Sequence, residues 1–467
     1  MDWVLLPTDA LFFGLLALAL VYGLRVARDP VQRTPWRAVF RRPTAAASAV
    51  VLAAFVLVAV LDSLHWRSGA PGGDSGAAYS GEVVSVLDRL LAPLRNGTEK
   101  TYSAPFATHG FVKETVALDG GRVVRVYPRL RHGGGGLADP GERGGDIARR
   151  AALGTVLGLA AWLPLALSAL GWRARSAGRP LAEVARRVAR GRTVMPWRTV
   201  LITGALVCVT VGVLGALSLN YHVFGTDKVG EDVLYQTIKS IRTGLLIGTL
   251  TTLVMLPFAV VLGLAAGYFR GWVDDVVQYL YTTLSSVPAV LLIAAAALMM
   301  DVYMANHPEA FASVTERADA RLLFLCLILG ITSWTSLCRL LRAETLKLRE
   351  LAYVEAAVAL GASAPRILRR HVLPNVMHIV VISVVLDFSA LVLAEAVLSY
   401  IQIGVDPTTY SWGNMINSAR LELAREPPVW WTLLAAMVFM FLLVLCANLF
   451  SDAVQAAFDP RRRGGAW

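Results

Sequence analysis

The stretch EAAVALGASAPRILRRHVLPN, Glu355–Asn375, is a patterned connector between two long apolar segments, 321–338 and 376–398. Small residues lead to a single glycine, and a basic run then precedes His-Val-Leu-Pro. An apolar segment of about 20 residues is long enough to cross the ~30 Å hydrocarbon core of a bilayer. The connector is therefore expected to lie at a membrane surface, between two helices that span the membrane.

The same stretch predicts two short helices joined by a tight turn. Good helix formers fill residues 350–360, and Gly361 can adopt the left-handed conformation that ends a helix. Ser363 is a natural N-cap, and Pro365 fits the first turn of a second helix. Pro374 then permits the chain to re-enter the membrane. We predict a helix–turn–helix that lies on the cytoplasmic face.

The side chains of this helix–turn–helix are expected to divide into an inward and an outward face. The expected inward set is Leu351, Val354, Val358, Ala362, Ile367 and Leu368, and the expected outward set is Arg366, Arg369 and Arg370. Small residues that allow close approach by another surface are Ala356, Ala357, Ala359 and Ala362. Two interpretations are open on the residues alone: the helices rest on their own bundle, or they form a docking surface for a partner.

The composition predicts an all-α polytopic membrane protein and excludes a soluble enzyme. Of the 467 residues, 56% are hydrophobic and 16% are charged, whereas soluble proteins have roughly a quarter charged residues. The net charge of +11 does not indicate nucleic-acid binding, because Lys and Arg cluster in short connectors beside apolar segments. No disulfide or metal site is expected from the four cysteines, which form no C-x-x-C pair: Cys208, Cys326, Cys338 and Cys446.

The hydropathy pattern predicts nine membrane spans. They lie near residues 9–26, 44–64, 151–172, 199–219, 242–268, 275–300, 321–342, 376–400 and 429–451. Alternation of these spans places four strongly basic connectors on one face: Arg25–Arg42, Arg173–Arg198, Arg339–Arg370 and Arg461–Arg463. The positive-inside rule makes that face cytoplasmic, with the N-terminus outside and the C-terminus in the cytoplasm.

Segment 67–150 is too polar to span the membrane and is expected on the outer face. Within it, FVKETVALDGGRVVRVYPRL predicts a β-hairpin whose two alternating strands flank Leu118-Asp119-Gly120-Gly121. This insert is either an inert, partly ordered segment or a docking surface for an extracytoplasmic partner.

Two further outer-face features are predicted. A short amphipathic helix at the membrane interface is expected to lead into the span near residue 242, because apolar residues recur at helical spacing: Val233, Leu234, Ile238 and Ile241. An aromatic belt is expected from Tyr410, Trp412, Trp430 and Trp431.

Glu-Ala-Ala, a glycine four residues after the second alanine, and His-x-Leu-Pro together resemble the EAA loop of ABC-importer permeases. The matching residues are Glu355, Ala356, Ala357, Gly361, His371, Leu373 and Pro374. In that family this loop is the coupling helix that docks into a groove on the ATP-hydrolysing subunit. The resemblance implies docking, and it implies a type I importer core of six spans that start near residues 199, 242, 275, 321, 376 and 429.

The resemblance covers roughly residues 224–461 and is to the second (C-type) permease of dipeptide/oligopeptide (nickel) importers. FGTDKVGEDVL resembles that subfamily's Gly-Thr-Asp-x-x-Gly-Arg-Asp stretch, with Glu231 where Arg is usual; the matching outer-face residues are Gly225, Thr226, Asp227, Gly230 and Asp232. AEAVLSYIQIGVDP resembles a Glu-x-x-Leu-Ser-Phe-Leu-Gly-Leu-Gly run, with Gln402 in place of a glycine; Glu395, Leu398, Ser399 and Gly404 are retained. LSSVPAVLL carries a matching Pro288.

Four regions follow from the spans and the resemblance. Residues 1–66 form an N-terminal membrane region with two spans, and residues 67–150 form the outer-face insert. Residues 151–198 add an extra span and a basic cytoplasmic connector. Residues 199–460 form the permease core, with the coupling loop at 348–374.

Two acidic residues, Asp387 and Glu395, are predicted to lie inside a span, where ionisable groups are costly and usually functional. With Ser399 and Pro288 they are candidates for lining or packing around the pathway. A proton-coupled secondary transporter would instead use the two carboxyl groups as proton carriers. A third class of protein is a membrane scaffold whose outer segment binds envelope partners.

The sequence contains no G-x-x-x-x-G-K-[ST] motif, so ATP and Mg²⁺ are expected on separate subunits. The resemblance implies a homologous second permease, two ATP-binding subunits and an extracytoplasmic substrate-binding protein, assembled in a bacterial inner membrane. The implied function is half of the translocation pathway for di- or oligopeptides or modified peptides. The chain itself is expected to be no enzyme, with no catalytic, cofactor or metal site.

Overall fold

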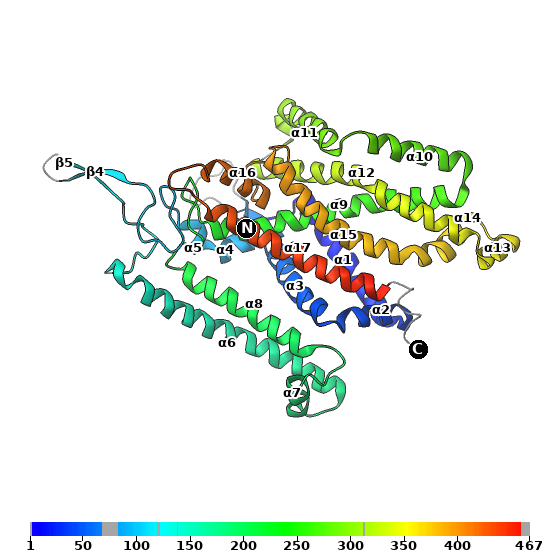
Figure 1. The fold of residues 1–467 in the computed structure, drawn as a ribbon, viewed down its shortest axis with the longest axis horizontal. Helices are drawn as coiled ribbons and strands as arrows, with labels where there is room; N and C mark the ends of the chain where they lie inside the picture. Colours follow the sequence, from blue (N-terminus) through cyan, green and yellow to red (C-terminus); the bar gives the residue numbers. More distant parts are fainter. Residues whose placement is uncertain (1, 68–82, 119–121, 138, 312, 459–467) are drawn as a thin grey trace. The chain divides into compact units, whose positions relative to one another are not determined.

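The computed structural model describes residues 2–67, 83–118, 122–137, 139–311 and 313–458. Within these ranges nine helices are long and apolar enough to cross a membrane, which confirms the predicted number (Figure 1). They are α1 (Pro7–Arg28), α3 (Pro43–Ser63), α6 (Arg143–Ala177), α8 (Trp197–Ser218), α9 (Val233–Phe269), α11 (Ala289–Asn306), α12 (Val314–Arg349), α15 (Leu373–Tyr400) and α17 (Trp431–Phe458). The basic connector Arg461–Arg463 and the hairpin turn Asp119–Gly121 lie outside the described residues.

The chain divides into two units, and each is described by itself. The first unit comprises Met1–Val4, Phe40–Thr243 and Tyr410–Cys446. The second comprises Leu5–Val39, Gly244–Thr409 and Ala447–Trp467. The chain passes from one unit to the other within α9, within α17 and at the last residue of α2 (Pro30–Phe40), so these three helices contribute residues to both.

The first unit contains the insert, which is predicted on the outer face, and the short strands. Strands β1 (Asp2–Val4), β2 (His65–Arg67) and β3 (Val83–Ser85) form a three-stranded antiparallel sheet, followed by α4 (Val86–Leu90) and α5 (Ala92–Asn96). Strands β4 (Glu114–Leu118) and β5 (Arg122–Val126) pair antiparallel with Val116 opposite Val124, so the predicted hairpin strands are confirmed. The unit also holds α16 (Trp412–Glu422).

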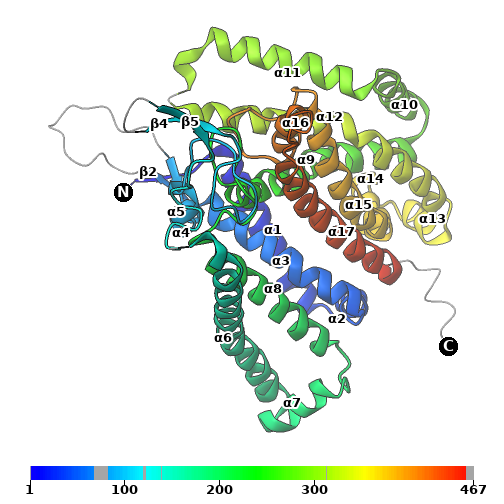
Figure 2. The ribbon, with the colours of Figure 1, turned by 60° about the vertical axis from the view of Figure 1, so that its left-hand side comes forward.

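Helices α6 and α8 lie side by side in both views and are joined by a connector that contains α7 (Leu181–Ala189) (Figures 1 and 2). Their contact depends on glycine. A Cβ atom on Gly212 would lie 2.4 Å from the Gly154 carbonyl oxygen, and one on Gly158 would lie 2.5 Å from the Cys208 carbonyl oxygen. Small residues at such crossings allow two membrane helices to pack backbone against backbone.

The second unit is built around α12, with α10 (Gly271–Ser286), α11 and α15 packed beside it. Its buried core includes Trp334, Cys338 and Leu341 of α12 together with Met255 and Ala259 of α9. A Cβ atom on Gly263 would lie 2.9 Å from the Cys338 carbonyl oxygen, so α9 and α12 approach closely at this glycine. Helix α2 (Pro30–Phe40) connects the first two membrane helices along the chain.

The single span predicted at 275–300 is wrong, because the structure divides it into α10 and α11. The break falls at Val287 and Pro288. Proline has no amide hydrogen to donate, and its ring disfavours helical backbone at the preceding residue. Val287 accordingly is extended, with φ −89° and ψ 132°. Of these two helices, only α11 is long and apolar enough to cross the membrane.

The separate amphipathic helix predicted before the span at 242 is also wrong. Helix α9 starts at Val233 and continues without interruption to Phe269. Val233, Leu234 and Ile241 are all buried, so the apolar spacing reports packing inside the protein rather than contact with the membrane interface. No Gly or Pro stands between residues 233 and 243 to end a helix.

The predicted aromatic belt is wrong for two of its four members. Trp412 and Trp431 are buried, whereas Trp430 is exposed. The Trp412 indole donates to the Thr237 carbonyl at 3.2 Å, and the Trp431 indole donates to the Thr226 carbonyl at 2.9 Å. Both indoles therefore form hydrogen bonds inside the protein, one to α9 and one to the segment just before it. They do not anchor the chain to lipid.

Candidate functional site

The predicted helix–turn–helix is present in the second unit. It comprises α13 (Ala352–Ala359), a turn, α14 (Ala364–Ile367) and a π-helical turn (Leu368–Val372) that runs directly into α15. Gly361 ends the first helix with φ +77°, as predicted. Ser363 is the N-cap of α14, but its carbonyl, not its hydroxyl, receives the amides of Arg366 and Ile367.

One face of this loop is anchored in the core. Val354, Ile367 and Val372 are buried at 1% exposure or less and pack in the cluster that contains Trp334 and Leu341. Leu351 and Val358, which were predicted to share this inward side, are 43% and 54% exposed. Helix α13 is only eight residues long. Val354 is its one buried residue and Ala357 packs partly buried on the same cluster, so Tyr353 and Val358 face outward.

The outward face of α13 and its turn is apolar. Leu351, Tyr353, Val358 and Leu360 are all exposed, and Leu360 is 88% exposed. The residues of the EAA loop lie on and around this face: Glu355, Ala356, Gly361 and Pro374 are exposed, and Ala357, His371 and Leu373 are partly buried. We name the surface formed by Leu351–Gly361 the loop face. An exposed apolar patch on an anchored element is typical of an interaction site.

The helix ends beside the loop face are joined by polar contacts that sequence reasoning did not identify. Arg342 of α12 makes a two-pronged contact with Asp274 of α10, with Nη2 2.6 Å from Oδ2. Arg349 donates to the Tyr268 carbonyl at 2.7 Å, and Arg270 pairs with Glu350. Bidentate Arg–carboxylate contacts fix geometry as well as adding energy. The cytoplasmic ends predicted for α9, α10 and α12 are thus connected beside the loop.

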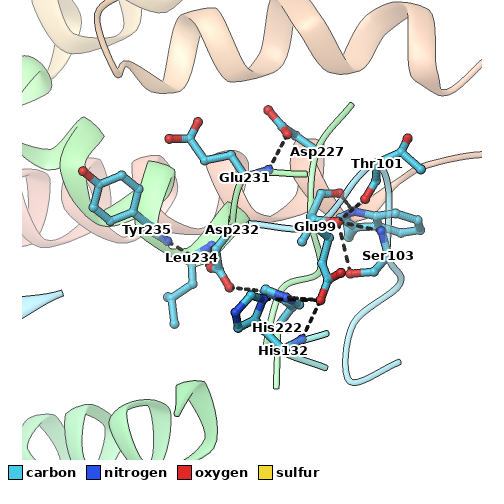
Figure 3. Close-up of polar contacts among 12 residues, drawn as sticks. Glu99, Thr101, Ser103, His132, His222, Asp227, Glu231, Asp232, Leu234 and Tyr235 are labelled. Atoms are coloured by element: carbon cyan, nitrogen blue, oxygen red, sulfur yellow. Dashed lines mark hydrogen bonds and ion pairs between the residues drawn. The ribbon is translucent and has the colours of Figure 1, made fainter. Parts of the chain in front are cut away.

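The segment Gly225–Asp232, which is predicted on the outer face, forms a second cluster, in the first unit (Figure 3). Asp232 is the N-cap of α9, because its Oδ1 accepts from the amides of Leu234 and Tyr235 at 2.8 and 3.2 Å. Asp227 folds the preceding turn by accepting from the amides of Val229 and Glu231. The two aspartates therefore shape the start of a membrane helix.

The insert packs directly on this segment. The Ser103 amide donates to the Thr226 hydroxyl at 2.6 Å, and the Thr226 hydroxyl donates to the Thr101 carbonyl at 2.9 Å (Figure 3). Gly230 has φ +79°, and a Cβ atom there would lie 1.8 Å from the Glu99 carbonyl oxygen. Only glycine permits this approach. The insert is thus built onto the segment that resembles the importer family.

His222 lies at the centre of a buried charge cluster (Figure 3). Its Nδ1 is 2.7 Å from Asp232 Oδ2, and its Nε2 is 3.7 Å from Glu99 Oε1. Burial alone would lower the pKa of His222, but the hydrogen bonds and charges of Asp232 and Glu99 outweigh burial and raise the pKa to about 9. A protonated imidazole between two carboxylates therefore ties the insert to the α9 cap at neutral pH.

The pKa of Glu99 is lowered by the same contact that raises the pKa of His222. Burial alone would raise the pKa of Glu99, but His222 and the backbone amides of His132 and Arg131 lower it to about 2. The two amides donate to Glu99 at 2.7 and 3.2 Å. Glu99 thus stays ionised, and it is held by backbone as well as by charge.

A second buried ion cluster joins the insert to α3 and α9. Lys239 Nζ is 2.6 Å from Asp62 Oδ1 and 2.9 Å from Asp88 Oδ1, and the Tyr235 hydroxyl donates to Asp88 at 2.7 Å. Burial alone would raise the pKa of Asp88, but Lys239, the Ser85 amide and Tyr235 lower it to about 2. No local sequence signal connects residues so far apart in the chain.

The acidic residues of α15 differ from each other. Glu395 is 2% exposed and accepts a hydrogen bond from the Ser399 hydroxyl at 2.7 Å. Asp387 is partly buried, and within the described residues it has no hydrogen bond or ion pair.

The turn after α15 is tightly packed. A Cβ atom on Gly404 would lie 2.1 Å from the Ser399 hydroxyl oxygen, so Gly404 packs directly on Ser399. Gln402 has φ +65°, a backbone conformation that glycine adopts without strain, and the resemblance leads us to expect glycine at this position.

Comparison with known proteins identifies the family. Residues 259–464 match the sequence model described as "Binding-protein-dependent transport system inner membrane component". The oligopeptide transport system permease protein OppC of Mycobacterium bovis is 32% identical over 244 residues, which cover 52% of this chain and 77% of the relative. The glutathione transport system permease protein GsiD of Pectobacterium atrosepticum is 31% identical over 240 residues, which cover 51% of this chain and 73% of the relative.

A third relative gives the same result. The dipeptide transport system permease protein DppC of Lactococcus lactis subsp. cremoris is 30% identical over 247 residues, which cover 53% of this chain and 66% of the relative. The predictions of an inner-membrane transport subunit, and of a chain that is not an enzyme, are confirmed. The chain belongs to the family of binding-protein-dependent transport system inner membrane components, in the group that contains these permeases.

Proposed function

We propose that this chain is one of two permease subunits of an ATP-driven importer, and that it couples to a separate ATPase through the loop face. The supporting observation is the combination of an anchored loop with an exposed apolar surface. Val354 and Ile367 fix the loop to the core, while Leu360 projects at 88% exposure. A surface of this kind is suited to insertion into a groove on a partner protein.

The loop transmits motion because it is continuous with membrane helices on both sides. Helix α12 leads into α13 within three residues, and α14 continues through a π-helical turn into α15. Closure of the ATPase subunits would displace α13 and α14, and α12 and α15 would move with them. A ligand-driven change requires contacts that differ between the two states. The loop face must therefore bind the ATP-bound and the nucleotide-free ATPase unequally.

ATP and Mg²⁺ would be bound by the partner ATPases, since the sequence of this chain has no Walker motif. A homologous second permease would form the other half of the pathway, and an extracytoplasmic binding protein would deliver the substrate. The basic connectors support a topology with the N-terminus outside and the C-terminus in the cytoplasm. A reporter fused to Trp467 that is active only in the cytoplasm tests this orientation.

The substrate class is proposed from the relatives. Those reported above are named as permeases for oligopeptides, dipeptides and glutathione, which are all short peptides. We propose di- or oligopeptides or modified peptides as the cargo of this chain. Glu395 and Ser399 in α15, with Pro288 at the start of α11, are the candidate residues for shaping the pathway.

Uptake of a labelled peptide into proteoliposomes tests the proposal. The complete transporter is expected to need ATP inside the vesicles, and Gly361→Asp is expected to abolish ATP-driven uptake without unfolding the chain. Gly178→Asp is the matched control, because Gly178 also ends a helix with positive φ and open space around it. Uptake at wild-type rate in Gly361→Asp would contradict coupling through the loop.

A proton-coupled carrier is the second candidate, and Asp387 is the observation that favours it. An ionisable group inside a membrane helix without a partner among the described residues is a functional hypothesis. This alternative predicts uptake by the purified chain alone, driven by a pH gradient and lost in Asp387→Asn. Absence of uptake by the chain alone, with ATP-driven uptake by the complete transporter, would exclude it.

A further inference from the structure

Helices α6 and α8 hold their connector at a membrane surface. Both are long and apolar enough to span the bilayer, and they pack backbone to backbone at Gly154, Gly158 and Gly212. Two spans locked in this way leave residues 178–196 no freedom to move far from the end of the pair. The connector therefore remains within reach of lipid headgroups.

Helix α7 lies across the ends of this pair with its apolar face already covered. Val184 and Val188 are buried against Ala174 of α6, and Trp197 and Leu201 of α8 pack on the same cluster. The opposite face of α7 is polar and exposed. It is therefore available to a partner without any rearrangement of the hydrophobic cluster.

That exposed surface is strongly basic. Residues 173–198 contain eight arginines and a single acidic residue, Glu183, which pairs with Arg187 at 2.8 Å and Arg179 at 3.3 Å. The exposed arginines without an acidic partner among the described residues are Arg175, Arg186, Arg190, Arg192 and Arg198. A cluster of four to eight basic residues next to a membrane helix attracts anionic lipid.

Exposed apolar side chains that suit the bilayer interface lie next to the arginines in the sequence. Trp172, Leu181 and Val194 are 66%, 43% and 70% exposed. Arg173 lies over the Trp197 ring at 5.2 Å, which keeps one cation at the level of an aromatic ring. Tryptophan is enriched at the headgroup level of membranes, where its ring is partly in the apolar phase.

We propose that residues 173–198 form a binding surface for anionic phospholipid headgroups. The arginines of α7 and its flanking turns contact the phosphate groups, and Trp172, Leu181 and Val194 contact the adjoining acyl region. This inference goes beyond transport. It depends only on α6 and α8 crossing the membrane, and it holds whether or not the chain couples to an ATPase.

The test is native mass spectrometry of the purified chain in detergent, titrated with phosphatidylglycerol and with phosphatidylcholine. Wild type is expected to bind phosphatidylglycerol preferentially. Arg175→Gln, Arg186→Gln, Arg190→Gln and Arg192→Gln, made together, are expected to weaken phosphatidylglycerol binding about tenfold or more. The matched control removes the same charge from the outer face, with Lys113→Gln, Arg125→Gln, Arg131→Gln and Lys228→Gln, and should bind like wild type.

Equal binding of both lipids by wild type would overturn the proposal, and so would wild-type lipid binding by the four-arginine variant. Should that variant fold poorly, wild type alone decides, because headgroup binding must weaken as NaCl rises. Binding unaffected by salt, or fully displaced by equimolar inorganic phosphate, would contradict a lipid surface. Loss of a co-purifying protein with lipid binding intact would reassign the surface to protein docking.

Discussion

Replacing His222 with Gln tests whether the insert is locked to the α9 cap by charge. The change removes the cation between Glu99 and Asp232, whose side chains are 6% and 1% exposed. A pKa raised from 6.5 to about 9 corresponds to about 3 kcal/mol of folding free energy. Because the pKa is raised in the folded state, this stabilisation is complete below pH 6.5 and is lost as the pH rises through 9.

Thermal unfolding in detergent, followed by tryptophan fluorescence at pH 6, 7.5 and 9, measures this effect. We expect the difference in Tm between wild type and His222→Gln to be largest at pH 6 and to shrink towards pH 9. His132→Gln is the matched control. His132 holds Glu99 through its backbone amide at 2.7 Å, which the substitution leaves in place. Its imidazole also lies 3.7 Å from Glu99 but is 50% exposed, so solvent screens this contact and the substitution should change the pH profile far less than His222→Gln does. A His222→Gln profile parallel to wild type would refute the charge lock.

Three further changes probe the packing. Gly212→Leu should separate α6 from α8 and lower Tm sharply, whereas Gly215→Leu, with open space on the same helix, should not. Arg342→Gln removes the two-pronged contact with the partly buried Asp274 and should cost about 2 kcal/mol in unfolding experiments, while adding Asp274→Asn should recover part of the loss. Gln402→Gly relieves positive φ and should raise the unfolding free energy by up to about 1 kcal/mol.

The membrane helices could be predicted because each is a local property of the sequence. A long apolar run indicates a span directly. Gly361 indicates the end of α13 because glycine readily adopts the positive φ that ends a helix. Pro288 marks the break between α10 and α11 in the sequence, but the residues on both sides are apolar, so the hydropathy pattern predicts one continuous span. The helix α9 was divided wrongly because its first turns are apolar on the side that faces protein.

The inner contacts of the insert could not be predicted because they join residues far apart in the chain. Glu99 and His222 are separated by more than a hundred residues, and Lys239 meets Asp62 across a still longer interval. Spacing rules describe neighbours along one helix or strand. The exposure of Leu351 and Val358 likewise could not be predicted. It depends on the angle at which the short helix α13 packs against the bundle, and the helical period alone does not determine that angle.

Co-purification measures the central claim most directly. The tagged chain is isolated from its native membranes in three forms: wild type, Leu360→Asp and the matched control Leu421→Asp. Leu421 is 71% exposed on the non-spanning helix α16, so the control introduces the same charge away from the loop face. We predict that wild type and Leu421→Asp retain an ATPase subunit and a second permease, and that Leu360→Asp loses the ATPase alone. Retention of the ATPase by Leu360→Asp would contradict docking through the loop face.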